Sequence, residues 1–193
     1  MERHRERHAK LIEAGFEVIS REGYSATSVK SVCTRAGLTE RYFYESFENR
    51  EALLAAIYKH VSEEMKTRIL GVLSNAPSAK GGVMRAVANA YFGALKADPR
   101  IARILFVESV HLGGTELMKK AGRELVDFIR TTANLYKPDT QLSEERQVLV
   151  GSGMFGAFVY IAIRWVEDGF RQPIEDVVES TVLIFEAIGK EVW

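Results

Sequence analysis

The sequence predicts an all-α protein. Its apolar residues recur at positions i, i+3, i+4 and i+7 through most of the chain, which is the period of a helix with one buried face. No stretch alternates apolar and polar residues with period two, so we expect no sheet. Residues that favour helix N-caps precede several of the apolar stripes, and glycine or proline follows them.

The stretch Ser28–Phe47 predicts a helix, a turn and a second helix. The first of these helices has one apolar face and ends at Gly37, because glycine readily adopts the positive φ of a helix C-terminus. The second begins after Thr39 and buries Phe43 and Phe47, which lie four residues apart on one face. This arrangement is the helix-turn-helix unit, whose second helix can enter a DNA major groove.

The outer face of the second motif helix carries residues suited to contact DNA. Its members are Thr39, Glu40, Arg41, Tyr42 and Tyr44. Arg41 can bond a guanine edge or a phosphate, and Tyr44 can donate its hydroxyl to a phosphate. Lys and Glu would be the ordinary residues on a solvated face. The alternative is a helical corner whose aromatic residues pack on a neighbouring domain.

Two helices flank the motif. The first ends at Gly23, with an apolar face from Leu11 to Ile19, and Thr27 or Ser28 caps the helix that follows it. After the motif, a long helix runs from its N-cap Asn49 to about residue 73. Residues 75–82 are rich in glycine, proline and small polar residues, so we expect a loop there.

Five further helices are expected after this loop. They are bounded by Met84 and Leu95, by Asp98 and Gly113, by Thr115 and Lys137, by Ser143 and Gly169, and by Pro173 and Trp193. The helix that ends at Gly169 is apolar around most of its circumference, and such a helix must be buried on more than one side.

Composition limits the class of protein. With 193 residues, 47% hydrophobic and 27% charged, the chain can build a globular core. The net charge is zero, so any DNA-facing basicity must be local, as it is within the first ten residues. The single cysteine, Cys33, excludes an intrachain disulfide and suits a reducing cytoplasm. We expect no signal peptide and no membrane span, because no run of 18 apolar residues occurs.

Several short motifs fall at a familiar spacing around the helix-turn-helix unit. They are Gly23-Tyr24, Thr27-Ser28-Val29, Ala36-Gly37-Leu38, Tyr44-x-x-Phe47 and Arg50-Glu51-x-Leu53. Through them the stretch from Leu11 to Leu54 resembles the TetR/AcrR family of transcriptional regulators. Gly15 and Cys33 depart from the usual alanines, and Arg41-Tyr42 is bulkier than the usual small pair, which affects the expected operator rather than the fold.

The resemblance implies two domains and about nine helices. Residues 1–49 would form a three-helix DNA-binding domain, and residues 50–193 a helical domain for ligand binding and dimerisation. The last two helices would pair with their twins in a four-helix dimer interface. The alternative is that both are core helices of a monomer.

The resemblance also implies a function. We expect a cytoplasmic, ligand-responsive repressor that binds a palindromic operator in double-stranded DNA as a homodimer. The residues expected to contact DNA are Thr27, Ser28, Lys30, Thr39, Glu40, Arg41, Tyr42, Tyr44 and Arg50. Of these, Arg41 and Tyr42 would carry most of the base recognition, and the residues before and after the motif would hold phosphates.

A mostly apolar small-molecule inducer would lie among the middle helices of such a protein. The candidate lining residues are Phe92, Phe106, His111, Met118, Phe128, Phe155 and Tyr160. Residues of these types can line a cavity for an apolar ligand. They can equally fill a core, since aromatic residues at helical spacing are core more often than pocket.

The sequence holds no recognisable catalytic or metal site. Its glycine pairs lack the Lys and Ser of a P-loop, and the motifs of zinc proteases and serine hydrolases are absent. One cysteine and four scattered histidines do not make a zinc cluster. We therefore expect no enzyme activity, cofactor or metal. The alternative function is a helical ligand-binding or interaction protein that does not read DNA, which the near-neutral N-terminal segment favours.

Overall fold

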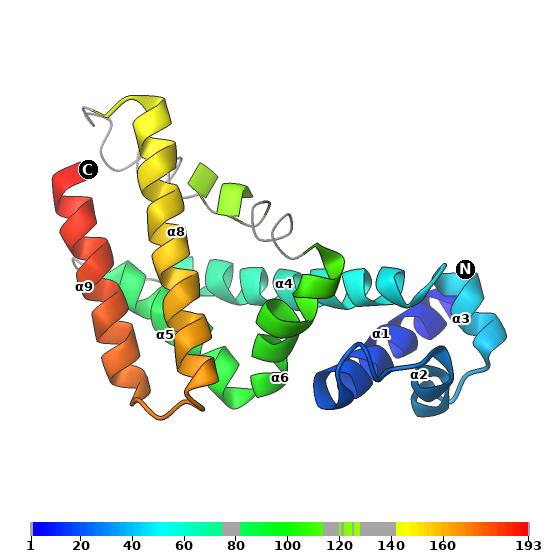
Figure 1. Ribbon diagram of the computed structural model, residues 1–193. Helices are drawn as coiled ribbons and strands as arrows, with labels where there is room; N and C mark the ends of the chain where they lie inside the picture. Colours follow the sequence, from blue (N-terminus) through cyan, green and yellow to red (C-terminus); the bar gives the residue numbers. More distant parts are fainter. Residues whose placement is uncertain are drawn as a thin grey trace. The chain divides into compact units, whose positions relative to one another are not determined.

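The computed structural model describes residues 2–74, 82–113, 120, 122–124, 126–127 and 142–192. The regular secondary structure of these residues is entirely helical, which confirms the predicted all-α class (Figure 1). The chain divides into two compact units. Unit 1 consists of Met1–Thr67 and Ala97–Gly114, and unit 2 consists of Arg68–Lys96 and Thr115–Trp193.

The N-terminal part of unit 1 is a three-helix domain. Helices α1 (Glu2–Glu22), α2 (Val29–Ala36) and α3 (Glu40–Ser46) pack against one another (Figure 1). The predicted apolar face of α1 is buried, and it meets buried side chains from the other two helices, among them Val32 and Phe43. Helix α1 already begins at Glu2, so the charged first ten residues belong to it.

Local signals in the sequence set the boundaries of α2. Ser28 forms a reciprocal capping box, because its hydroxyl accepts from the backbone N–H of Ser31 while the Ser31 hydroxyl accepts from that of Ser28, both at 3.0 Å. At the other end Gly37 has φ 67°, and the N–H of Leu38 donates to the carbonyl of Cys33 at 3.0 Å. The predicted turn between the two motif helices is confirmed.

The long helix after the motif is also confirmed. Helix α4 spans Arg50–Leu73, and Oδ1 of Asn49 accepts from the N–H of Ala52 at 2.8 Å. A Cβ atom at Gly15 would lie 2.8 Å from Cδ1 of Ile57 and 3.0 Å from Cδ2 of Leu53. Glycine in place of the family's usual alanine therefore lets α1 approach α4 closely. Residues 75–81 of the predicted loop lie outside the described residues.

The segment after Asp98 differs from the single helix that the sequence predicts. Helix α6 covers only Pro99–Ala102, a π-helical turn η1 covers Arg103–Val107, and a 3₁₀-helix η2 covers Glu108–Leu112. A π-turn holds more residues than an α-turn, so it changes which side chains face the core. Here the polar residues Glu108 and Ser109 are buried, a result that apolar periodicity alone does not predict.

Unit 2 has an aromatic core. It contains α5 (Gly82–Ala97, with its last residue in unit 1), α8 (Glu144–Glu167) and α9 (Ile174–Val192). Phe92 is fully buried, with its ring centroid 5.2 Å from that of Phe158 and 5.8 Å from that of Trp165. Helices α8 and α9 lie side by side (yellow to orange and orange to red in Figure 1).

Of the helix predicted between Thr115 and Lys137, only residues 120, 122–124, 126 and 127 are described, and they are helical.

Helix α8 is less buried than its composition predicts. Leu149 and Tyr160 are exposed on it within the single chain, as is Leu183 on α9. By length and composition α8 is also apolar enough to cross a membrane, and it alone meets that test among the described residues. Core helices of soluble proteins meet the same test, so this is weak evidence for a membrane span.

Candidate DNA-binding surface

Helix α3 buries one face and exposes the other. Phe43 is fully buried and Phe47 nearly so, and their ring centroids lie 5.8 Å apart. Tyr44, one residue further round the helix from Phe43, is 58% exposed. Thr39, Glu40 and Arg41 are exposed as well. The aromatic pair therefore anchors α3 in the domain, and the predicted outer face is open to a partner.

Polar groups at the starts of α2 and α3 extend this surface. Ser28 and Lys30 are exposed at the first turn of α2. Thr39 occupies the N-cap position of α3, but its side chain makes no capping hydrogen bond. Hydroxyl, ammonium and backbone N–H groups at helix N-termini are suited to bind phosphate oxygens. These three residues are therefore accessible to a partner, and their phosphate contacts stay a prediction.

Thr27 and Arg50 have internal contacts instead. Thr27 is buried, and its hydroxyl donates to the carbonyl of Gly23 at 2.8 Å. Arg50 is half-buried, with its guanidinium 5.0 Å from the centre of the Tyr24 ring, and it donates to the carbonyl oxygens of Tyr24 and Thr27. Both side chains hold the link between α1 and α2. Their placement does not support the predicted phosphate contacts.

Two residues that the sequence analysis did not select contact the predicted base-reading residues. Glu45 accepts from Nε of Arg41 at 3.0 Å and also pairs with Arg7 at 3.7 Å. The guanidinium carbon of Arg7 lies 4.2 Å from the centre of the Tyr42 ring. The i,i+4 spacing of Arg41 and Glu45 is a signal for their pair. Nothing in the sequence indicates that Arg7, from the start of α1, reaches α3.

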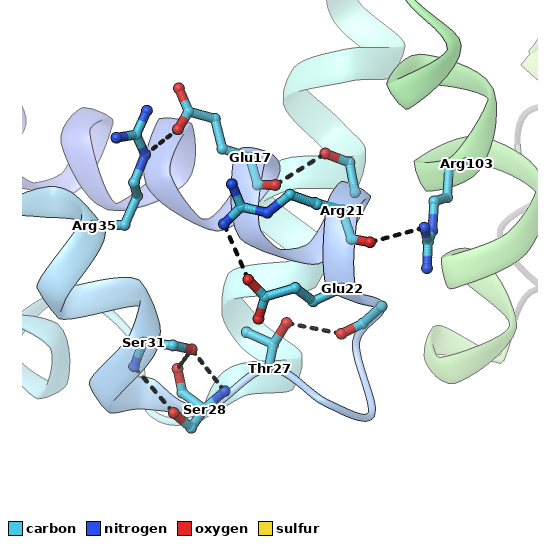
Figure 2. A network of polar contacts seen from close by, with 10 residues as sticks. Glu17, Arg21, Glu22, Thr27, Ser28, Ser31, Arg35 and Arg103 are labelled. Atoms are coloured by element: carbon cyan, nitrogen blue, oxygen red, sulfur yellow. Dashed lines mark hydrogen bonds and ion pairs between the residues drawn. The ribbon is translucent and has the colours of Figure 1, made fainter.

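Polar contacts also fix the other side of the domain (Figure 2). Glu17 on α1 forms a hydrogen-bonded ion pair with Arg35 on α2, and this bond holds the pKa of the Glu17 carboxyl below its usual value. The carbonyl of Arg21, near the end of α1, accepts from Arg103 at 3.2 Å. Figure 2 shows these contacts together with the capping box of Ser28 and Ser31 at the start of α2. They limit the positions that α2, and with it the turn to α3, can take.

The candidate ligand residues are in different surroundings. In unit 1, Phe106 is half-buried, and His111 is exposed with its ring centroid 4.9 Å from that of Tyr24. In unit 2, Phe92 belongs to the aromatic core, Phe155 is half-buried and Tyr160 is exposed. Met118 and Phe128 lie outside the described residues. Phe92 thus fits the core alternative, and the described residues contain no cluster of three or more potential metal ligands.

Residues 11–57 match the family model described as "Bacterial regulatory proteins, tetR family". The chain thus carries the N-terminal domain of the TetR family of transcriptional regulators. The matched segment runs from α1 into α4, so it contains the whole of the helix-turn-helix unit. The family resemblance predicted from the motifs between Leu11 and Leu54 is therefore confirmed, as is a function in transcriptional regulation.

Curated relatives of this chain are regulators. The fatty acid metabolism regulator protein of Bacillus subtilis is 23% identical over 149 residues, covering 77% of this chain and 76% of its own. The HTH-type transcriptional activator FasR of Mycolicibacterium smegmatis is 25% identical over 180 residues, covering 92% of this chain and 80% of its own. One relative is named an activator, and none of these names describes an enzyme.

Solved structures share the fold of this chain. The fatty acid degradation regulator FadR from Bacillus halodurans has a TM-score of 0.71 at 20% identity, covering 92% of this chain and 93% of its own. FadR from Bacillus subtilis, solved in complex with stearoyl-CoA, has a TM-score of 0.70 at 19% identity, covering 91% and 96%. These likenesses extend through both units, so the fold beyond the helix-turn-helix unit is that of a TetR-family regulator as well.

Proposed function

We propose that this regulator binds a palindromic operator as a homodimer and represses until a ligand with a long apolar chain releases it. The observation that carries the DNA-binding part is the division of α3 between a buried face, with Phe43 at its centre, and an exposed face with Arg41 and Tyr44. A short helix anchored on one side and polar on the other fits a major groove.

Within this proposal the exposed residues divide into two groups. Arg41 and Tyr42 contact base edges, since α3 is the helix that enters the groove and an arginine can bond guanine at two atoms. Ser28, Lys30, Thr39 and Tyr44 hold phosphates, which fix the orientation of the protein without selecting a sequence. Glu40 lies in the first turn of α3 and contacts a cytosine amino group if it reaches the bases. The α3 helices of the two protomers lie about 34–36 Å apart, one turn of duplex.

Selection of bound duplexes tests this part. The protein is mixed with random-sequence duplex DNA, and the retained fragments are sequenced. We expect an inverted repeat, bound with an affinity that falls steeply with salt as phosphate contacts release counterions. Retention without sequence preference would favour the alternative of an interaction protein that does not read DNA.

The exposed apolar side chains of α8 and α9 support the dimer. Leu149 is 72% exposed and Leu183 is 70% exposed in the single chain, and a second copy that covers them would remove this apolar area from water. Leu149→Glu and Leu183→Glu should each convert dimer to monomer in sedimentation velocity. Val83→Glu, at an exposed apolar position on α5, is the matched control and should leave the dimer intact. Dimers in all three variants would contradict this interface.

The ligand that we propose is a long-chain acyl-coenzyme A. Two relatives are named as regulators of fatty acid metabolism or degradation, and one neighbour was solved with stearoyl-CoA. Stearoyl-CoA should bind to the protein and lower its affinity for the selected duplex, and by linkage the duplex should lower the affinity for stearoyl-CoA by the same factor. Free coenzyme A is the control. Identical effects of both compounds, or none from either, would contradict the ligand while leaving DNA binding in place.

This function needs no catalytic step, metal or cofactor, in keeping with relatives that are regulators rather than enzymes. The proposed function places the protein in the cytoplasm, because a bacterial operator lies on DNA in that compartment. The buried thiol of Cys33 agrees with a reducing compartment, because burial raises the pKa of Cys33 and keeps the thiol in its unreactive protonated form.

A further inference from the structure

We propose that Arg7, at the start of α1, is a positioning residue that sets the orientation of both base-reading side chains, Arg41 and Tyr42. This inference rests on the proposed DNA binding and adds a residue that lies outside the helix-turn-helix unit and outside the matched segment 11–57. Its basis is a chain of contacts from α1 to the exposed face of α3.

The first contact orients Tyr42. The guanidinium carbon of Arg7 lies 4.2 Å from the centre of the Tyr42 ring, within the range of a cation–π interaction. Tyr42 is half-buried, whereas Arg41 and Tyr44 on either side of it are exposed. A planar guanidinium stacked on one face of a ring restricts the rotation of the side chain. The hydroxyl of Tyr42 is thereby held in one region of the surface before DNA arrives.

The second contact orients Arg41 through Glu45. Arg7 pairs with one carboxylate oxygen of Glu45 at 3.7 Å, and the other oxygen accepts from Nε of Arg41 at 3.0 Å. This bond engages Nε of Arg41 and leaves its two terminal Nη nitrogens free to donate to DNA. These two nitrogens would make the bidentate contact to O6 and N7 of guanine. The side chain of Arg41 is otherwise 84% exposed, so without the carboxylate it would sample many rotamers.

The charge balance of this cluster explains why Glu45 does not simply withdraw Arg41 from DNA. A lone carboxylate beside the groove would repel phosphates and compete with them for Arg41. Two guanidiniums share the carboxylate of Glu45, so the three groups together carry one positive charge. The cluster therefore orients Arg41 while remaining attractive to a polyanion.

Two more contacts hold the start of α1 against α3. Nε2 of His4 lies 3.4 Å from the carbonyl oxygen of Glu45, and the ring centroid of His8 lies 4.7 Å from that of Phe47. Arg7 lies between these histidines in the sequence, so its backbone is supported on both sides. A phosphate-binding arm would not need such contacts, because its side chains only have to follow the DNA backbone.

The test compares Arg7→Met with Arg5→Met. Methionine keeps an unbranched stem and removes the charge, and Arg5 is an exposed arginine two residues away with no partner among the described residues. Binding constants are measured for the selected duplex, for single-base-pair variants of it and for a duplex of unrelated sequence, over a range of salt concentrations. The wild-type protein is measured first.

We expect Arg7→Met to reduce discrimination between the selected duplex and its variants by about two- to tenfold, the cost of ordering one or two mobile side chains. The slope of the salt dependence should fall by well under one unit, because Arg7 attracts the polyanion from a distance without contacting a phosphate. Arg5→Met should leave discrimination unchanged. Glu45→Gln removes the charge that holds both arginines, so it weakens the same link to Arg41 and should reproduce the loss, and it decides the question if Arg7→Met fails to fold by circular dichroism.

Other outcomes would overturn the inference. If Arg7→Met weakens binding to all duplexes equally and lowers the salt slope by about one unit, Arg7 is a phosphate contact. If Arg7→Met and Glu45→Gln both bind as the wild type does, the cluster has no effect on recognition. If the wild type itself shows no preference for any duplex, the proposed DNA reading fails, and the inference falls with it.

Discussion

Both units have an apolar core, but unit 1 adds buried polar contacts between segments far apart in the chain. In unit 1, the carboxylate of Glu108 accepts from the N–H of Tyr24 at 2.9 Å and from Nε of Arg103 at 3.0 Å, which joins segments 84 residues apart. In unit 2, the rings of Tyr91, Phe92 and Phe158 pack against one another. Ionic contacts require every partner in one geometry, whereas apolar packing depends mainly on the volume that is filled. Unit 1, which carries the proposed DNA-binding surface, thus depends more on individual polar atoms.

The largest effect is expected in the aromatic core. Phe92→Ala removes a fully buried ring that lies among three other rings and should cost about 3–5 kcal/mol of unfolding free energy in urea. Phe92→Leu is the control that keeps most of the volume and should cost much less. If Phe92→Ala cost less than about 1 kcal/mol, the ring would line a cavity rather than fill a core.

A smaller effect is expected at the ionic junction. Glu108→Gln weakens the bonds to Tyr24 and Arg103 and should cost about 1.5–3 kcal/mol, because its side chain is only 5% exposed while Arg103 can return to water. Glu22→Gln is the control, since the pair of Glu22 with Arg21 is exposed and worth about 0–1 kcal/mol. The unfolding free energies of both variants are measured in urea. Equal losses of unfolding free energy would mean that the burial of Glu108 does not strengthen its contacts.

Two glycines of α8 sharpen the description of unit 2. A Cβ atom at Gly151 would lie 3.0 Å from Cγ1 of Val126, while one at Gly153 would meet nothing within 4 Å. In the monomeric Leu183→Glu background, Gly153→Ala should therefore stabilise the fold by about 1 kcal/mol through helix propensity. Gly151→Ala should gain less or lose stability, because Val126 must move. Thermal unfolding of the two variants provides the comparison, and identical shifts would contradict the contact with Val126.

The smallest effect is expected from acid. Hydrogen bonds from Arg35 and Arg100 hold the pKa values of Glu17 and Asp98 below their usual range. A carboxylate with a lowered folded-state pKa stabilises the fold above its unfolded pKa, about 4, and that contribution is lost as pH falls through the folded value. Melting temperatures should thus decline below about pH 5. In the double variant Glu17→Gln/Asp98→Asn, the melting temperature should decline less steeply with falling pH. A decline as steep as in the wild type would mean that other titratable groups cause it.

The sequence was sufficient where structure is set by neighbouring residues. Ser28, Gly37, Asn49 and Ser143 bound the helices that they were predicted to bound, because capping acts over three or four residues. The buried face of α1 followed from its period for the same reason. These local rules were enough to predict the helix-turn-helix unit and the exposed face of α3.

Contacts between distant positions could not be predicted in this way. Arg50 was assigned to phosphate from its place beside the motif, but it donates to carbonyls more than twenty residues earlier in the chain. The spacing of Ile101, Ile104 and Leu105 fits an ordinary helix, and it gives no sign of the π-turn or of the contacts that Arg103 makes with Glu108 and with the carbonyl of Arg21. Periodicity likewise cannot distinguish an aromatic side chain that fills the core from one that lines a ligand pocket. The sequence alone therefore does not decide between these two roles for Phe92.

The early start of α1 has a practical consequence. Because the helix begins at Glu2 and His4 already touches the backbone of Glu45, an affinity tag fused to the N-terminus emerges beside the recognition helix. A histidine tag there adds titratable cations within reach of Tyr42 and Arg41. Retention on DNA measured with such a fusion would include attraction by the tag, so the tag should be cleaved off before operator preference is compared.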